Sequence, residues 1–124
     1  MGDEIRAVEP GALREGAATP GVVREISFDL PGVTQMRARA APHAATGWHH
    51  HGDRDVLGYV VRGRARFEFG PGGSRSTDVP EGGFFHVPAG LVHRDVNPAA
   101  EPQEIVLAIV GNGPLVVNVD GPDA

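Results

Sequence analysis

The chain has 124 residues, 40% of them hydrophobic, a size that suits one compact domain with one core. Its formal net charge is −5, and its eleven basic residues are all arginines, scattered among sixteen acidic residues. This composition excludes lysine chemistry such as Schiff-base formation, and the scattered arginines argue against a nucleic-acid-binding surface. The absence of cysteine excludes disulfides, thiolate nucleophiles and cysteine zinc sites.

The placement of glycine and proline predicts an all-β chain, with an irregular or extended segment over residues 1–21 and one domain over 22–124. Glycine and proline together make up 29 residues (18 plus 11), and they separate short runs rich in β-forming residues. Turns such as residues 62–64 and 88–90 let consecutive strands pair antiparallel. Such short, regularly spaced strands imply a sandwich or barrel. The predicted strands are residues 22–30, 34–41, 56–62, 65–69, 84–87, 93–97, 104–110 and 115–119.

The strongest local signal is the run of three histidines at positions 49, 50 and 51. Because side chains alternate across an extended strand, His49 and His51 face one side and His50 faces the other. A divalent ion needs convergent neutral imidazole nitrogens, and His93, which follows the turn at residues 88–90, can supply a third. From the spacing alone, a solvated histidine-rich loop explains the run equally well.

The segment from Gly82 to Asn97 carries a family resemblance. It reads glycine, five residues, Pro88, one residue, Gly90, two residues, His93, three residues, asparagine. This spacing is similar to the second cupin motif, and residues 49–63, from the histidine run to a glycine, resemble the first. The chain therefore resembles a small single-domain cupin of the cupin 2 type over residues 42–97. The resemblance implies an antiparallel double-stranded β-helix, which is a jelly-roll barrel.

The chain departs from the first cupin motif at one position. Val56 stands where cupins usually place a metal-binding glutamate, and Asp55, one residue earlier, points to the opposite face of a regular strand. We therefore favour a site with three histidine ligands, which also resembles the thiol dioxygenase branch of the cupins. Whether Asp53 or Asp55 moves in as a fourth ligand stays open.

We expect the site residues His49, His51 and His93 to hold one divalent metal ion per chain. Imidazole ligands suit Fe, Zn, Ni and Mn alike, so the sequence does not select the metal. Without the glutamate the site is about one charge unit more positive, which favours a small polar or anionic ligand.

Four further residues are candidates for the substrate pocket, each with a structural alternative. His86 is an acid–base candidate, although a buried histidine with one hydrogen bond is favoured. Trp48 can wall the pocket, and a core or subunit-contact role is slightly favoured. Arg39 can anchor a carboxylate, and a solvated strand face is favoured for it. Val56 becomes a pocket residue if it points into the barrel.

Three functions follow from these observations. The first is a metal-dependent oxidoreductase, similar to Fe(II) dioxygenases, because three protein ligands leave positions open for O₂ or substrate. The second is a non-catalytic cupin that binds or senses a small ligand. The third is an isomerase or epimerase, which needs a base in the pocket.

Oligomeric state and location are also expectations. Cupins are frequently dimers, so the resemblance implies a homodimer, with residues 1–21 as the segment to be exchanged between subunits. Apolar runs are too short to span a bilayer and the first residues are too acidic for a secretory signal, so we expect a cytoplasmic protein without a membrane partner.

Overall fold

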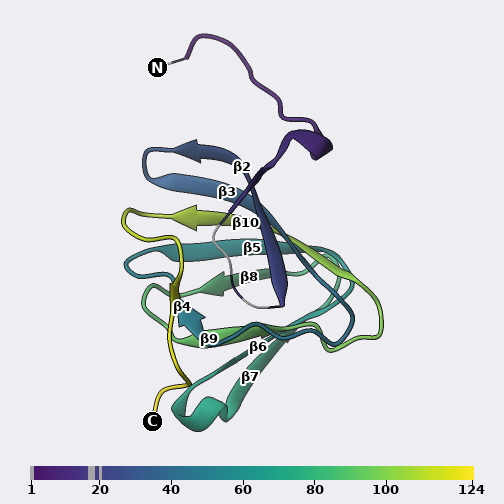
Figure 1. Ribbon diagram of the computed structural model, residues 1–124, viewed down its shortest axis with the longest axis vertical. Coiled ribbons are helices and arrows are strands. Elements are labelled where there is room, and N and C mark those ends of the chain that lie inside the picture. Colours follow the sequence, from purple (N-terminus) through teal and green to yellow (C-terminus); the bar gives the residue numbers. More distant parts are fainter. Residues whose placement is uncertain (1, 17–18, 20) are drawn as a thin grey trace.

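Two antiparallel sheets form the protein in the computed structural model, which describes residues 2–16, 19 and 21–124. The strands of the larger sheet, in spatial order, are β1 (Arg14–Glu15), β2 (Val22–Leu30), β3 (Val33–Ala40), β10 (Gln103–Val110), β5 (Asp55–Arg62) and β8 (Phe84–Val87). Those of the smaller sheet are β11 (Val117–Asn118), β4 (His49–His50), β9 (His93–Val96), β6 (Ala65–Phe69) and β7 (Arg75–Val79). Two short 3₁₀ helices complete the elements: η1 (Pro10–Ala12) and η2 (Pro71–Gly73). Figure 1 shows β2, β3, β10, β5 and β8 lying side by side.

One hydrophobic core lies between the two sheets. In β5 the residues alternate between buried and exposed, so Val56, Gly58 and Val60 face inward while Leu57 and Tyr59 face outward. Strands of both sheets contribute to the same buried cluster, so the two sheets stabilise each other. The buried cluster consists of Ile26, Met36, Ala38, Val56, Val60, Ala65, Phe67, Val79, Val87, Ile105, Leu107 and Ile109.

The structure confirms the all-β class and most of the predicted strands. The strands at 22–30, 65–69 and 84–87 have the predicted bounds, and the other five differ at their ends. Sequence patterns missed β1 and β4, which have two residues each, and β7. In β7 only Val79 is buried, so this polar edge strand lacks the apolar alternation that reveals a strand.

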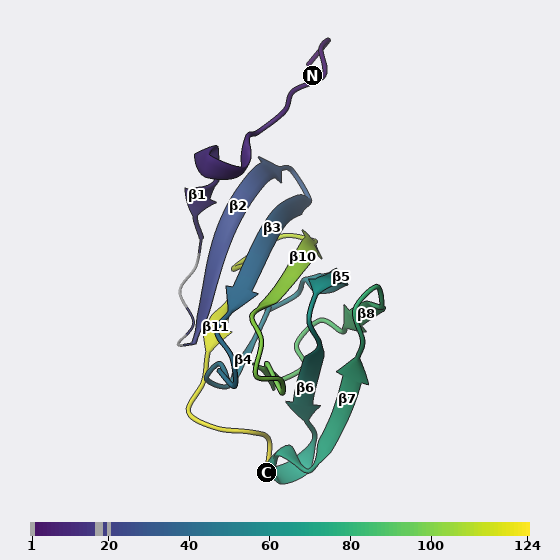
Figure 2. The same ribbon diagram turned by 90° about the vertical axis from the view of Figure 1, so that its right-hand side faces the viewer.

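The N-terminal segment lies along the edge of the larger sheet. Strand β1 pairs with β2, and the Gly16 amide donates a hydrogen bond of 2.8 Å to the Arg24 carbonyl. Thr19 is buried and bridges Val22. Before η1 the chain extends away from both sheets (Figures 1 and 2). The predicted irregular segment 1–21 includes residues 1, 17, 18 and 20, which lie outside the described residues.

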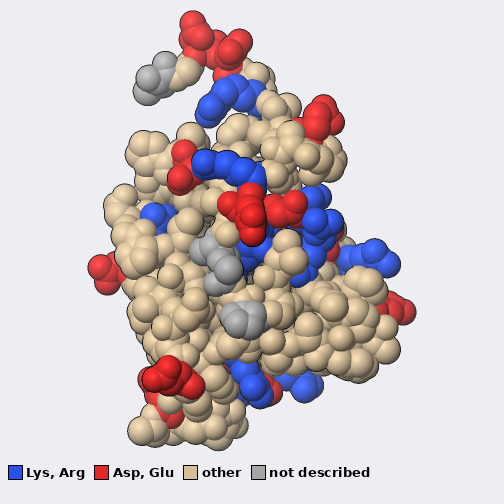
Figure 3. Space-filling model, viewed as in Figure 1, with Lys and Arg blue, Asp and Glu red and all other residues tan. Residues whose placement is uncertain are grey.

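The surface combines interspersed charges with apolar side chains on the outer face of the larger sheet. Acidic and basic residues are intermingled on the face shown in Figure 3. On the outer side of β5 and β8, Leu57, Tyr59 and Phe84 are exposed, and the Tyr59 and Phe84 rings lie 4.8 Å apart. The homodimer stays a prediction. Within the described part of the chain, no helix has the length and hydropathy needed to cross a membrane.

Replacement of Gly58 by alanine tests the packing between β5 and β8. Gly58 lies opposite Phe85, and a Cβ atom there would come within 2.1 Å of the Phe85 ring. We expect Gly58→Ala to lower the free energy of unfolding by about 1–3 kcal/mol, the usual cost of overpacking, as measured by denaturant titration. Adding Phe85→Leu should recover part of the loss, and Gly121→Ala, at an open position, is the control. An unchanged stability would contradict this packing.

Candidate metal centre

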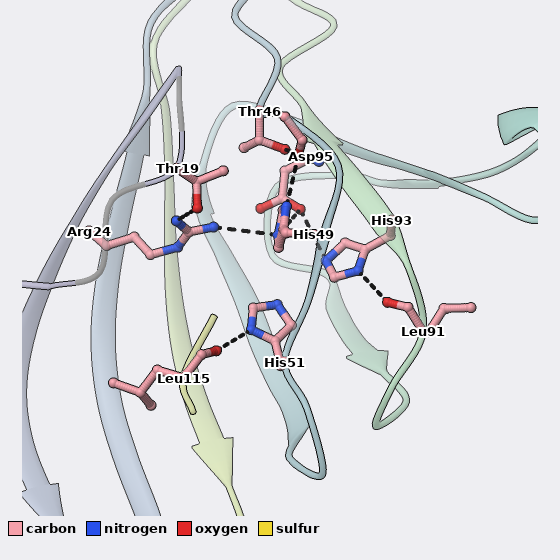
Figure 4. Close-up of polar contacts among 10 residues, drawn as sticks. Thr19, Arg24, Thr46, His49, His51, Leu91, His93, Asp95 and Leu115 are labelled. Atoms are coloured by element: carbon pink, nitrogen blue, oxygen red, sulfur yellow. Dashed lines mark hydrogen bonds and ion pairs between the residues drawn. The ribbon is translucent and has the colours of Figure 1, made fainter. Parts of the chain in front are cut away.

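Three histidines from two neighbouring strands and a following loop meet inside the barrel. In the β4–β9 pair His49 lies directly opposite His93, and His51 follows β4 by one residue. All three side chains are buried, with exposed fractions of 0%, 4% and 2% for His49, His51 and His93. Ring centroids lie 4.4–5.2 Å apart, and one nitrogen from each lies within 4.8 Å of the others. Figure 4 shows the rings turned toward one another.

Backbone carbonyls hold each of the three rings in one orientation. The Nδ1 atoms of His49, His51 and His93 lie 2.9, 2.7 and 2.9 Å from carbonyl oxygens that only accept hydrogen bonds. Each Nδ1 therefore carries the proton and donates it, which leaves a lone pair on each Nε2. Such fixed tautomers are the usual support of histidine metal ligands. The accepting carbonyls belong to Gly47, Leu115 and Leu91, in that order.

Burial keeps His49 and His51 in the neutral form that a metal requires. Loss of solvent lowers the pKa of His49 and of His51 from 6.5 to about 4, and the neighbouring His93 lowers both further. Hydrogen bonds to backbone carbonyls and the negative charge of Asp95 act in the opposite direction without cancelling the effect of burial. At neutral pH both imidazoles are therefore uncharged and ready to bind a cation.

Two charged residues accompany the histidines: the buried Arg24 from β2 and Asp95 from β9, whose side chain is 14% exposed (Figure 4). The Arg24 guanidinium donates to the Thr19 hydroxyl, and one of its nitrogens lies 3.5 Å from Nε2 of His49. Since arginine only donates hydrogen bonds, this contact supports the lone pair on that Nε2. Burial lowers the pKa of Arg24, and Asp95 opposes the effect.

The Asp95 carboxylate places a negative charge beside His49 and His93. Its Oδ1 lies 3.4 Å from Nε2 of His93 and 3.6 Å from Nε2 of His49. Burial favours the neutral acid, but the two histidines and Arg24 outweigh it, so the pKa of Asp95 lies below its ordinary value of 3.8. The buried Oδ1 has no hydrogen-bond partner among the described residues. Nitrogen lone pairs beside an unpartnered carboxylate oxygen form a donor set that fits a divalent cation.

The remaining sequence candidates lie away from this centre. His86 is on the outer face of β8, 52% exposed, with Nε2 2.8 Å from Asp55 Oδ1. The expectation of a buried His86 is therefore wrong, because its position in β8 alternates with the inward-facing Phe85 and Val87. The Asp55 carboxylate is held on the same outer face and also accepts a hydrogen bond from the Ala89 amide.

The other three candidates do not bind to the histidine cluster. Among the interactions of the described residues, none links that cluster to Trp48, Arg39 or Val56. Trp48 lies on the opposite face of the strand from His49, where Arg94 stacks over its ring at 5.0 Å. Arg39 is exposed and pairs with Glu25 at 2.6 Å, so its solvated interpretation is the one the structure supports. Val56 faces inward as expected, but it packs in the hydrophobic core.

A cavity of about 390 Å³ adjoins the histidine cluster. His93 and the pocket candidate His86 form part of its wall, and most of the other lining residues are apolar, among them Phe67, Phe69 and Phe85. The Phe67 and Phe85 rings lie 4.6 Å apart, and Phe67 lies 6.4 Å from the His93 ring. An apolar group in this cavity would therefore lie next to the histidine cluster.

Sequence reasoning missed Arg24 and Asp95, although a signal for both was present. Arg24 lies on the inward face of β2, the same face as the buried Ile26 two residues later. Asp95 follows His93 by two residues, so the alternation that groups His49 with His51 also groups Asp95 with His93. A charged residue at an inward strand position is the feature to look for.

Comparison with known proteins identifies the family. The family model described as the cupin domain matches residues 36–110, more than half of the chain. The chain belongs to the cupin family. The match includes all three histidines and both motifs. A search of curated proteins finds no match.

Solved cupin structures share the fold. An uncharacterized conserved protein with a double-stranded β-helix domain from Klebsiella pneumoniae has a TM-score of 0.74 at 17% identity, covering 94% of this chain and 99% of that chain. The polyketide cyclase RemF from Streptomyces resistomycificus has a TM-score of 0.74 at 18% identity, covering 94% and 86%. Oxalate decarboxylase from Bacillus subtilis has a TM-score of 0.71 at 20% identity, covering 86% of this cupin and 30% of that chain. At these identities the likeness shows a double-stranded β-helix.

Substitution of the histidines tests the centre. We expect the wild-type cupin to bind close to one equivalent of Mn²⁺, Fe²⁺ or Zn²⁺, and His49→Ala and His93→Ala to lose it, because each removes one of three ligands. His50→Ala is the matched control, since His50 points away and accepts a hydrogen bond from the Gly52 amide. Metal content is measured by mass spectrometry after dialysis. Retention of metal in His49→Ala and His93→Ala would contradict the assignment.

Acid should destabilise the chelator-treated cupin. Because the pKa of His51 is about 4 in the folded chain and about 6.5 in the unfolded chain, only the unfolded chain gains this proton between those values. The free energy of unfolding should therefore fall as pH drops from 7 to 4, by on the order of 2–3 kcal/mol for this residue. Urea titrations along this pH range should show a smaller fall for His51→Asn and the wild-type fall for His50→Asn. If the free energy of unfolding fell equally with pH in all three proteins, the effect could not be assigned to His51.

Proposed function

We propose that this cupin is a metal-dependent, dioxygenase-like enzyme that acts on a small acid with an apolar body. One observation carries the proposal: three buried Nε2 lone pairs point into one site, and backbone carbonyls fix each of them. Three histidines leave positions for further ligands, as catalytic metal sites require. A bound divalent ion would supply Lewis acidity and, as Fe(II), one-electron chemistry with O₂.

The charge of the site favours an anionic substrate. Arg24 is buried beside His49, and its guanidinium remains charged in proteins. This positive charge, 3.5 Å from Nε2 of His49, would attract an anionic group that approached the histidine cluster. Two of the solved structures similar to this cupin, oxalate decarboxylase and an oxalate oxidase in complex with the substrate analogue glycolate, act on small acids. This similarity supports the proposed substrate class.

The shape of the site favours an apolar body on that acid. The cavity beside His93 is large enough for an aromatic ring, and Phe67, Phe69 and Phe85 contribute to its walls. An oxalate-sized molecule would leave most of that apolar surface unused. We therefore propose an aromatic or branched acid whose carboxylate lies at the metal and whose body lies between these rings.

The site also bears on the alternative functions. An isomerase needs a base in the pocket, and the base expected for it, His86, lies at the cavity wall with its Nε2 2.8 Å from Asp55 Oδ1. A non-catalytic binding cupin uses the same pocket and ligand, so it differs from the enzyme in one observable, the consumption of O₂. Dioxygenation places both oxygen atoms in the substrate and needs no separate reductant.

An oxygen-electrode screen of the Fe(II)-loaded cupin tests the proposal. We expect O₂ uptake with members of a panel of aromatic and branched 2-hydroxy and 2-keto acids, and none with the corresponding amides. In calorimetry, phenylacetate should bind at least about tenfold more tightly than acetate, because the ring buries apolar surface at roughly 25 cal/mol per Å². Phe85→Ala should reduce this ratio, and Leu57→Ala, on the outer face, should preserve it.

The outcomes separate the candidate functions. Binding of acids without O₂ uptake across the panel would favour the non-catalytic cupin. Equal affinity for phenylacetate and phenylacetamide would remove the charge argument, and equal affinity for phenylacetate and acetate would remove the cavity argument.

A further inference from the structure

The histidine cluster contains a buried carboxylate oxygen that the three-histidine site does not use. Asp95 lies two residues after His93 on β9, so both side chains face the interior of the barrel. Its Oδ1 is 3.4 Å from Nε2 of His93 and 3.6 Å from Nε2 of His49. This atom is buried and has no hydrogen-bond partner among the residues that the structure describes.

The positions of the protons make this arrangement costly without a cation. Nδ1 of His49 and of His93 each donate to a carbonyl, so both Nε2 atoms present lone pairs toward Oδ1. Three acceptors therefore face one another; the Arg24 guanidinium lies 3.5 Å from Nε2 of His49, and Oδ1 has no hydrogen-bond partner among the described residues. Buried acceptors without donors are rare in folded proteins and call for an explanation such as a bound ion. A divalent ion at their centre would bind all three atoms at once.

The distances fit shared ligation. Metal bonds of about 2.1 Å place adjacent ligand atoms roughly 3.0 Å apart around an octahedral ion and roughly 3.4 Å apart around a tetrahedral one. The observed separations of 3.4 and 3.6 Å need only a small contraction. Thr46 holds the backbone at this point, because its hydroxyl accepts from the Asp95 amide and its amide donates to the Asp95 carbonyl, both at 2.9 Å.

We propose that the Asp95 carboxylate is the fourth protein ligand of the divalent ion, an inference that rests on the proposed metal site. It replaces, from β9, the carboxylate that is missing at Val56 on β5. The two acids considered from the sequence are placed elsewhere: Asp55 binds His86 and the Ala89 amide on the outer face, and Asp53 is exposed. Four protein ligands on a six-coordinate ion leave two positions for substrates.

A cysteine in place of Asp95 gives a direct spectroscopic test. The chain has no cysteine, so any thiolate-to-cobalt charge-transfer band after Co²⁺ loading must come from the introduced residue. We expect this near-ultraviolet band in Asp95→Cys and its absence in Asp55→Cys, which places the thiol on the outer face. Because cobalt loading requires no turnover, the result does not depend on knowing the substrate.

The affinity for Co²⁺ provides a second measurement on a nearly isosteric variant. We expect Asp95→Asn to weaken binding by more than about 100-fold, beyond the roughly 10–100-fold effect of residues that only support a ligand. Asp55→Asn should bind like wild type, and circular dichroism should show folded protein for both variants.

Each result decides a different claim. A missing charge-transfer band in folded Asp95→Cys, or Asp95→Asn affinity within 100-fold of wild type, would overturn the fourth-ligand assignment while leaving the three-histidine site intact. If wild type itself binds no Co²⁺, the proposed metal site fails together with this inference.

Discussion

The pairing of β4 with β9 sets His49 opposite His93, and the rest of the histidine cluster depends on that register. A shift of one residue would turn these side chains to the outer face of the sheet and bring Trp48 and Arg94 inward. The pairing works together with the carbonyls that accept from each Nδ1, because strand geometry places the rings and the hydrogen bonds rotate them. The site is thus organised by the backbone.

Charge inside the barrel is balanced among groups from different strands. Arg24 on β2 and Asp95 on β9 are a cation and an anion beside the histidine cluster, and their opposite charges offset each other. A divalent ion would make the centre positive, which is the basis for proposing an acid as substrate. The adjoining cavity contributes apolar surface, so in the proposed function charge would select the head of the substrate and shape would select its body.

Much of this architecture was predictable because glycine spacing, strand alternation and two motifs agree with one another. Alternation placed His49 and His51 together, and it correctly put Asp55 on the outer face and Val56 inside. It failed for β7, whose exposed edge carries no apolar pattern. The exposure of His86 follows from the same alternation, because its neighbours Phe85 and Val87 on β8 face inward.

The most direct test of the central claim is an anomalous difference map from a crystal of this cupin loaded with Mn²⁺ or Zn²⁺. The account predicts one peak per chain, about 2.0–2.2 Å from Nε2 of His49, His51 and His93. The Nδ1 atoms should still donate to their carbonyls. A peak bound instead at His50, or between His86 and Asp55, would contradict the account, as would an empty cluster at saturating metal.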